Sequence, residues 1–308
     1  MKGVFMKKLL PSFLSACFIA FVSSNAFCWV EDFSSDPGWN YAGESSVSLF
    51  SWNGASGAVG AQWSSDKLTT RYYTSLGDDV TENSSFKFGC DIQLNSLAQD
   101  PWGMEIAFGL FNSNNTGDNR TGYYDGDFNY HTGDTINTLE MDYFPYQDGY
   151  GGPWFGGTVI PSVDSDPDEP GNQVKVVYSG SEVTYSTVGF DGGELPLNIW
   201  LYPEVTYNAS DKTVSFIVYT DAARTSIAVI NGVSAVSNFI YTGDAFVLNS
   251  FGFFSYYDYL DFDPATPSIN GTGMFDNAYF TVVPEPSSFV LFIGGLLGVF
   301  FFRPRKKA

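Results

Sequence analysis

The sequence predicts an all-β protein built as one antiparallel β-sandwich, and three observations lead to that prediction. Apolar and polar residues alternate along many short segments, which is the pattern of half-buried strands. Clusters of Gly, Asn and Asp separate these segments, as at 112–126 and 148–157. No segment has the spacing of an amphipathic helix, and neither an internal repeat nor a linker divides the body. A chain of this kind, with about a dozen strands, fits a single large sandwich.

The clearest strand is expected at 85–94, where Phe86, Phe88 and Cys90 point to one side and Lys87 and Asp91 to the other. This register puts Cys90 on the apolar face, although a disulfide between Cys28 and Cys90 stays open as an alternative. The same alternation occurs at 104–110 and 214–218. Further strands are expected around 68–75, 139–145, 174–178, 183–188, 199–207, 226–230, 246–256 and 274–282.

The N-terminal region has the features of a secretory signal peptide. Lys2, Lys7 and Lys8 precede an apolar run at 9–22, and Ser24-Asn25-Ala26 supplies the small residues that a signal peptidase needs. We therefore expect a signal peptide at 1–26 and a mature start at Phe27. The alternative is a lipoprotein box ending at Cys17, which would leave an apolar start to the mature protein.

The C-terminal region predicts a membrane-spanning helix at 287–302. Residues 286–302 carry no charge, and as a helix they would extend roughly 25 Å, which is the short end of what crosses a bilayer. A basic tail follows, and clustered positive charge marks the cytoplasmic side, so the body would lie outside the cytoplasm. The tail consists of Arg303, Arg305, Lys306 and Lys307. The alternative is a buried terminal helix or strand of the body.

The sequence Pro284-Glu285-Pro286, followed by a glycine-containing apolar run and a basic tail, resembles the sorting signal of bacterial PEP-CTERM proteins. The resemblance covers 282–308. It implies recognition by an exosortase, a transient stay in the inner membrane, and export to the surface of a Gram-negative cell that makes exopolysaccharide. The two prolines oppose helix and central-strand structure, which leaves an extended segment for an enzyme to hold.

The body between these signals, 27–281, is strongly acidic. Seven of the 14 basic residues and 33 of the 34 acidic residues remain in it, so its net charge is −26. Such a surface repels nucleic acid and other polyanions and is soluble in an extracellular matrix. We therefore expect no nucleic-acid partner.

The two edges of the body resemble the concanavalin A-like lectin and glucanase jelly-roll class. Glu31-Asp32-Phe33 opens the body and Gly273-Met274-Phe275-Asp276-Asn277 closes it. The resemblance implies that the first and last strands lie side by side. Another sandwich of Greek-key type is the alternative.

Aromatic residues in or beside Gly- and Asp-rich loops are candidates for glycan binding, because flat rings suit the apolar faces of pyranoses. These candidates are Tyr123, Tyr124, Tyr143, Trp154 and Tyr257. Rings that cover loop edges or fill the core are the alternative.

Short runs of acidic residues make calcium the one cofactor that the sequence suggests. Asp125, Asp127 and Asn129 place oxygen ligands at alternate positions, but Tyr130 stands where an EF-hand loop has Gly, and Ile136 where it has Glu. A solvated turn is the alternative, and we otherwise expect no cofactor.

A short segment resembles the catalytic strand of laminarinase-like hydrolases. Glu140 would match the nucleophile and Asp142 its assisting residue, but the acid/base position falls on Phe144 or Pro145. Glu105 is a distant substitute. We therefore predict a non-enzymatic, surface-sorted protein of the extracellular polysaccharide matrix, with a lectin-like module and a polysaccharide hydrolase as the alternatives.

Overall fold

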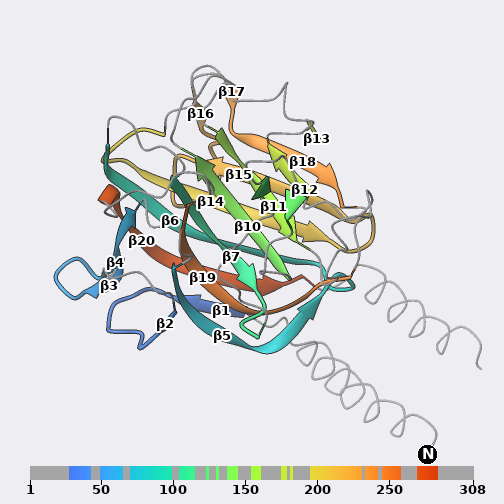
Figure 1. Ribbon diagram of the computed structural model, residues 1–308, viewed down its shortest axis with the longest axis horizontal. Helices are drawn as coiled ribbons and strands as arrows, with labels where there is room; N and C mark the ends of the chain where they lie inside the picture. The colour runs from blue at the N-terminus through green and yellow to red at the C-terminus, as the bar shows by residue number, and fades with distance from the viewer. Residues whose placement is uncertain are drawn as a thin grey trace, which may run out of the picture.

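The computed structural model confirms the antiparallel β-sandwich (Figure 1). It describes residues 28–42, 49–64, 70–98, 104–114, 123–124, 130–131, 137–144, 154–160, 175–178, 181–182, 195–230, 233–241, 245–257 and 269–283. Within these ranges every residue in regular structure belongs to a strand, and no helix is long and apolar enough to cross a membrane. The expected helix at 287–302 and the signal peptide at 1–26 lie outside the described residues.

Two eight-stranded sheets form the body. Sheet A has the order β18-β15-β14-β6-β20-β4-β3, with β1 also paired to β20. Its strands are β1 (Cys28–Glu31), β3 (Phe50–Asn53), β4 (Ala58–Ser64), β6 (Phe86–Leu97), β14 (Trp200–Asn208), β15 (Thr213–Tyr219), β18 (Val236–Ile240) and β20 (Ile269–Val282).

Sheet B has the order β13-β12-β11-β10-β7-β19-β5-β2. Its strands are β2 (Asn40–Ala42), β5 (Thr70–Thr81), β7 (Met104–Phe111), β10 (Thr138–Phe144), β11 (Trp154–Ile160), β12 (Lys175–Tyr178), β13 (Ser181–Glu182) and β19 (Val247–Tyr257). Two small ribbons pair β8 (Tyr123–Tyr124) with β9 (Tyr130–His131), and β16 (Val229–Ile230) with β17 (Val233–Ser234).

The alternation that predicted the strands also builds the core. Phe86, Phe88 and Cys90 of β6 are fully buried against sheet B, as their register required. Across the sandwich, Phe253 of β19 stacks on Phe275 of β20, with ring centroids 4.0 Å apart and planes 4° apart. Because these rings come from different sheets, their contact helps to hold the two layers together.

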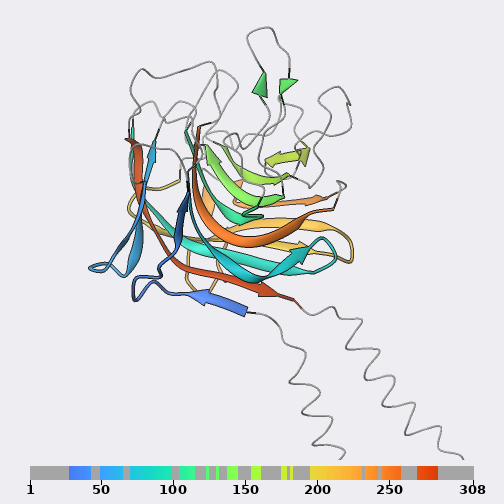
Figure 2. The same ribbon diagram turned by 60° about the horizontal axis from the view of Figure 1, so that its bottom comes forward.

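The first and last strands lie side by side, as the resemblance implied. Cys28 pairs with Thr281 and Glu31 with Ala278 in antiparallel register, and Figure 2 shows the start of β1 beside the end of β20. Both described cysteines are free thiols: Cys28 is exposed and Cys90 is buried. The structure therefore does not pair them.

The two ends of the sandwich bring together different segments of the chain. At the end that we call proximal, the turn at 82–85 carries the chain from β5 to β6, and Val282, Phe86 and Tyr207 lie in one row of sheet A. At the opposite, distal end, the backbone N–H of Leu195 donates to the hydroxyl oxygen of Tyr143, at 3.1 Å. A strand such as β14, with nine residues, separates the two ends by about 30 Å.

A polar cluster covers the outer face of sheet A. Arg224, from the loop after β15, donates to Asp91 at 3.0 Å and lies over the Tyr279 ring at 4.8 Å. The side-chain amide of Asn277 donates to the other oxygen of Asp91 at 2.8 Å. Burial raises the pKa of Asp91, and these two partners oppose that rise. Asp276 pairs with Asp91 across the strands, and burial raises its pKa as well.

Some strands differ from those expected. The hairpin of β3 and β4 was not anticipated, because Ala58–Ser64 is rich in small residues and has no regular alternation. The expected strand at 226–230 is reduced to Val229–Ile230, and the one at 183–188 lies outside the described residues.

We predict that Cys90→Ala lowers the free energy of unfolding by about 1–2 kcal/mol, because it removes a fully buried side chain and leaves a small void. Urea unfolding of the purified body measures this change. Cys28→Ala is the matched control, since Cys28 is exposed, and we expect it to be nearly neutral. An equal loss for both variants would contradict the packing role of Cys90.

We predict that Asp276→Asn gains stability relative to the wild type as the pH rises above about 4. A carboxyl whose pKa is higher in the folded state keeps its proton longer there, so the wild type loses stability as the pH rises through that folded pKa. Asparagine has no such loss and can still accept the hydrogen bond from the Asn277 N–H. Urea titrations at about pH 3.5 and 6.5 measure the difference; a difference that does not change with pH would contradict this assignment.

Candidate functional site

The end of β20 leads directly into the predicted sorting motif. β20 ends at Val282, and the backbone N–H of Val283 donates to the carbonyl oxygen of Ser85 at 2.7 Å. The next residue is Pro284. The motif residues Pro284, Glu285 and Pro286 and the basic residues Arg303, Arg305, Lys306 and Lys307 lie outside the described residues. The sheet thus holds the chain up to the residue before the motif.

Two neighbouring strands fix the end of β20. Val282 pairs with Phe86 of β6 on one side, while Thr281 pairs with Cys28 of β1 on the other. Phe280 is fully buried in the core. An extended ligand can join a strand only at a free edge, and β20 has none between Tyr279 and Thr281.

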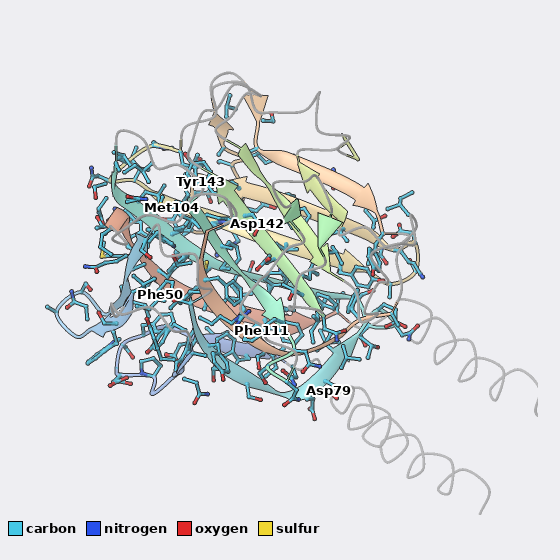
Figure 3. All side chains as sticks on the ribbon, in the orientation of Figure 1. Phe50, Asp79, Met104, Phe111, Asp142 and Tyr143 are labelled. Carbon is cyan, nitrogen blue, oxygen red and sulfur yellow. The ribbon has the colours of Figure 1, made fainter. Side chains whose placement is uncertain are left out.

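A second candidate lies on the outer face of sheet B, where carboxylates gather. Glu140 and Asp142 of β10 share this face, as predicted, and Asp142 pairs with Ala107 of β7. Glu105, two residues before Ala107, is therefore a diagonal neighbour of Asp142, within reach of a long side chain. All three carboxylates have exposed fractions of 1% or less. Figure 3 marks the positions of Asp142 and of Phe111, which belongs to the same face.

Arg71 of β5 is the basic residue on this face among the described positions. It pairs with Phe254 of β19, which in turn pairs with Ala107, so Arg71 and Asp142 lie in one row across four strands. Arg71 is 4% exposed, and its guanidinium lies 5.9 Å from the centroid of the Phe111 ring. Burying charged groups is costly unless they are paired or hydrogen-bonded, and Arg71 and the three carboxylates all have interaction partners in the structure.

The outer face of sheet B is packed among its described residues. Ala107, Phe111 and Phe254 form a small apolar cluster with Tyr73 against it. A Cβ added at Gly252 would meet the rings of Phe254 and Phe111 at 3.1 and 3.2 Å. The space beside Gly252 is therefore filled by neighbouring side chains.

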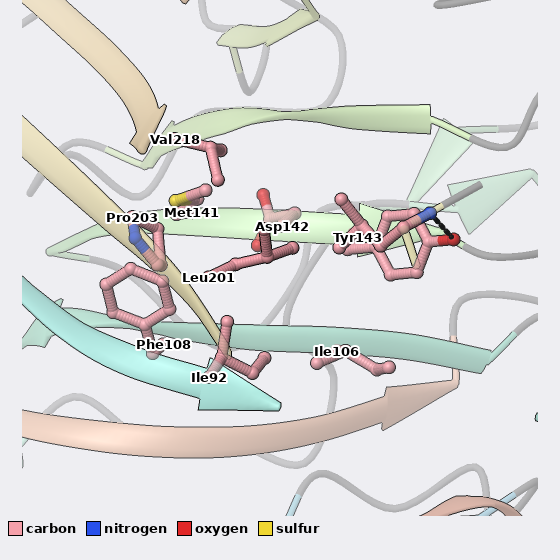
Figure 4. Close-up of a pocket in the computed structure, with 10 residues that line it drawn as sticks. Ile92, Ile106, Phe108, Met141, Asp142, Tyr143, Leu201, Pro203 and Val218 are labelled. Carbon is pink, nitrogen blue, oxygen red and sulfur yellow. Dashed lines mark hydrogen bonds between the residues drawn. The ribbon is translucent and has the colours of Figure 1, made fainter. Parts of the chain in front are cut away.

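Tyr143 is a core residue and not a surface platform. Its side chain is 2% exposed and faces the inside of the sandwich with Leu139 and Met141. Beside it is a cavity of about 20 Å³ lined mainly by apolar side chains from both sheets, such as Ile106 and Leu201 (Figure 4). A cavity of this size accommodates about one water molecule, which is far smaller than a sugar ring. In this arrangement Tyr143 cannot stack on a glycan.

For the other aromatic candidates, the structure describes only the position of the backbone. Tyr123 and Tyr124 form β8, opposite His131 and Tyr130. Trp154 and Tyr257 lie at the distal ends of their strands, opposite Phe144 and Met104 respectively.

The proposed calcium ligands Asp125, Asp127 and Asn129 lie outside the described residues. In the described part of the chain, no group of three His, Cys, Asp or Glu residues is arranged to hold a metal ion. Calcium binding thus stays a prediction.

The position of Glu105 near the β10 carboxylates depends on the register between β7 and β10, which are separated in sequence. The sequence named Glu105 as a substitute, but it gave no means of placing it diagonal to Asp142. Arg71 was not among the predicted site residues. It is next to Tyr72 in the expected strand at 68–75, and because neighbouring strand residues face opposite sides, it lies on the outer face when Tyr72 faces the core.

Residues 282–306 match the family model of the PEP-CTERM protein-sorting motif. Among curated proteins, none matches the chain.

Solved structures similar to this chain include the carbohydrate recognition domain of Emp47p, with 13% identity and a TM-score of 0.47, covering 85% of this chain and 97% of that one. Winged bean acidic lectin in complex with methyl-α-D-galactose has 12% identity and a TM-score of 0.45, covering 84% and 99%. Lectin II from Ulex europaeus has 13% identity and a TM-score of 0.44, covering 83% and 98%. The chain thus carries a PEP-CTERM sorting motif directly behind a two-sheet, all-β body.

Proposed function

We propose that this protein is an exported substrate of an exosortase, which recognises its C-terminal segment and removes it from a membrane-anchored intermediate. The observation that carries this proposal is the match of 282–306 to the sorting motif, in a chain whose last strand ends at Val282. The order of a folded domain, an extended proline-containing segment, an apolar run and a basic tail is what a membrane-associated processing enzyme requires. The domain remains outside while the segment is held at the membrane.

We further propose that the mature body is a non-enzymatic component of the extracellular polysaccharide matrix. Its net charge of −26 favours solubility among neutral or cation-bridged polymers. Glu105, Glu140 and Asp142 favour a binding or structural role over hydrolysis, because all three side chains are buried. A glycosidase needs its two carboxyl groups to flank a sugar that has entered a cleft.

A carbohydrate-binding module is the second candidate, and one observation favours it. Trp154 and Tyr257 lie at strand ends of sheet B at the distal end, opposite the end from which the sorting motif leaves. Aromatic residues at strand ends beside Gly- and Asp-rich connections suit sugar recognition. The body would then present its glycan-binding residues away from the membrane.

We predict that the surface protein isolated from its native host lacks the segment beyond the motif. Mass spectrometry of the mature protein should give peptides up to the end of β20 and none from 289–308. Replacing Pro284, Glu285 and Pro286 together by Ala should leave the tail in place, because the motif is lost while the apolar run stays. An intact tail in the wild-type surface protein would mean a simple membrane anchor.

We predict that the purified body does not release reducing sugar from laminarin or from the host's own matrix. The same preparation, tested on a glycan array with and without calcium, measures binding and its dependence on the metal. Trp154→Ala should abolish any glycan binding that the array detects, and Tyr41→Ala is a matched control at an exposed aromatic residue of β2. If sugar is released, and Glu140→Gln abolishes its release, the body is an enzyme.

A further inference from the structure

We infer that the sorting enzyme acts in direct contact with the folded body, on its proximal end, and that the bond it breaks lies between Val283 and Phe289. This inference rests on the proposed function and adds to it a docking surface and a cleavage window. Its basis is that Val283, which a hydrogen bond to Ser85 holds at the end of the described chain, directly precedes the sorting motif.

The upstream limit of the window comes from the sheet. Val283 is held by its hydrogen bond to Ser85, and Thr281 is paired with Cys28. Because β6 and β1 occupy both edges of β20 from Tyr279 to Thr281, the enzyme cannot hold these residues as an added strand. A bond before Val283 would be reached only after Val282 had left its pairing with Phe86.

The downstream limit comes from the apolar run. Five residues, 284–288, lie between Val283 and Phe289, where the run begins. A fully extended chain covers at most about 3.3–3.6 Å per residue, so Val283 and Phe289 lie no more than roughly 20 Å apart. The lipid headgroups take up about 5–8 Å of that distance. An enzyme that encloses a bond in this segment therefore has the folded body against it.

The surface that such an enzyme meets is the rim around Val283. We define the rim as the turn at 82–85 and the turn at 209–212. These parts belong together, because the Tyr207 hydroxyl donates to the Glu82 carbonyl at 2.9 Å and the Ala209 N–H donates to the Ser85 hydroxyl at 2.9 Å. The rim exposes Asn83, Asp211 and Lys212. It is thus a polar, hydrogen-bonded collar around the exit of the chain, suited to a polar extracytoplasmic face of the enzyme.

The test uses a bulky label at a single thiol in the full-length chain. Cys17→Ala and Cys28→Ser remove the other reactive thiols, since Cys90 is fully buried. Asn83→Cys places a thiol on the rim, and Ala223→Cys places the matched control in the exposed loop after the distal end of β15. Each variant is treated with a polyethylene glycol maleimide, and processing is followed in membranes of the native host that contain the sorting enzyme.

We expect the label at position 83 to lower the processed fraction several-fold and the label at position 223 to leave it unchanged. A spacer of about ten Gly/Ser residues after Val283 adds roughly 17 Å of mean reach and should restore processing of the rim-labelled chain. Mass spectrometry should place the new C-terminus between Val283 and Ser288.

The proposed docking surface is wrong if the two labelled chains are processed equally. It is also wrong if the spacer does not restore processing of the chain labelled at position 83. The unlabelled chain and the triple Ala variant of the motif separate this outcome from the proposed function. If the unlabelled chain is processed and the motif variant is not, the proposed function stands whatever the labels do. An unlabelled chain that is never processed overturns both.

Discussion

The central position of β20 in sheet A is the constraint on which the rest of this structure depends. β20 pairs with β6, β4 and β1, so the last strand joins three strands from the early part of the chain into one sheet. On its inner face, Phe275 stacks against Phe253 of sheet B. On its outer face, Asn277 and Tyr279 contact the Asp91–Arg224 cluster. One strand therefore takes part in the sheet, in the inter-sheet core and in the polar outer surface.

The outer faces of the two sheets use charge in different ways. On sheet A, Asp91 and Arg224 form a direct pair whose exposed side-chain fractions are 8% and 19%, and the pair holds a loop onto the sheet. On sheet B, Glu105, Glu140 and Asp142 are buried deeper and share their face with Arg71. A paired charge that fixes a loop is an ordinary structural device. The sheet B carboxylates also have interaction partners, which the burial of charge requires.

Local patterns predicted the parts of the fold that depend on nearest neighbours. The alternation in 85–94 was enough to place Cys90 in the core, because the two faces of a strand follow from a period of two. The same rule applied to 139–143 puts Tyr143 with Leu139 and Met141, on the face opposite Glu140 and Asp142. The prediction that Tyr143 binds a glycan gave more weight to the adjacent loop than to the strand that contains Tyr143.

Other features depend on contacts that no local pattern contains. The diagonal arrangement of Glu105 and Asp142 follows from the register of β7 with β10, and the intervening connection does not encode that register. The hairpin of β3 and β4 was hidden because Ala58, Gly60 and Ala61 give little contrast between its faces. Conversely, the sorting motif could be identified from sequence alone, since its parts follow one another along the chain.

The pairing of β1 with β20 also has a consequence for the timing of folding. These strands are separated by nearly the whole length of the body, so this contact has a very high sequence separation and closes late. A chain that crosses a membrane from its N-terminus exposes β1 long before β20. Until β20 arrives, β6, β4 and β1 lack their common partner, and their unpaired edges are open to wrong pairing. We therefore expect the secreted chain to need protection during export, and its final, slow folding step to coincide with the emergence of the sorting motif.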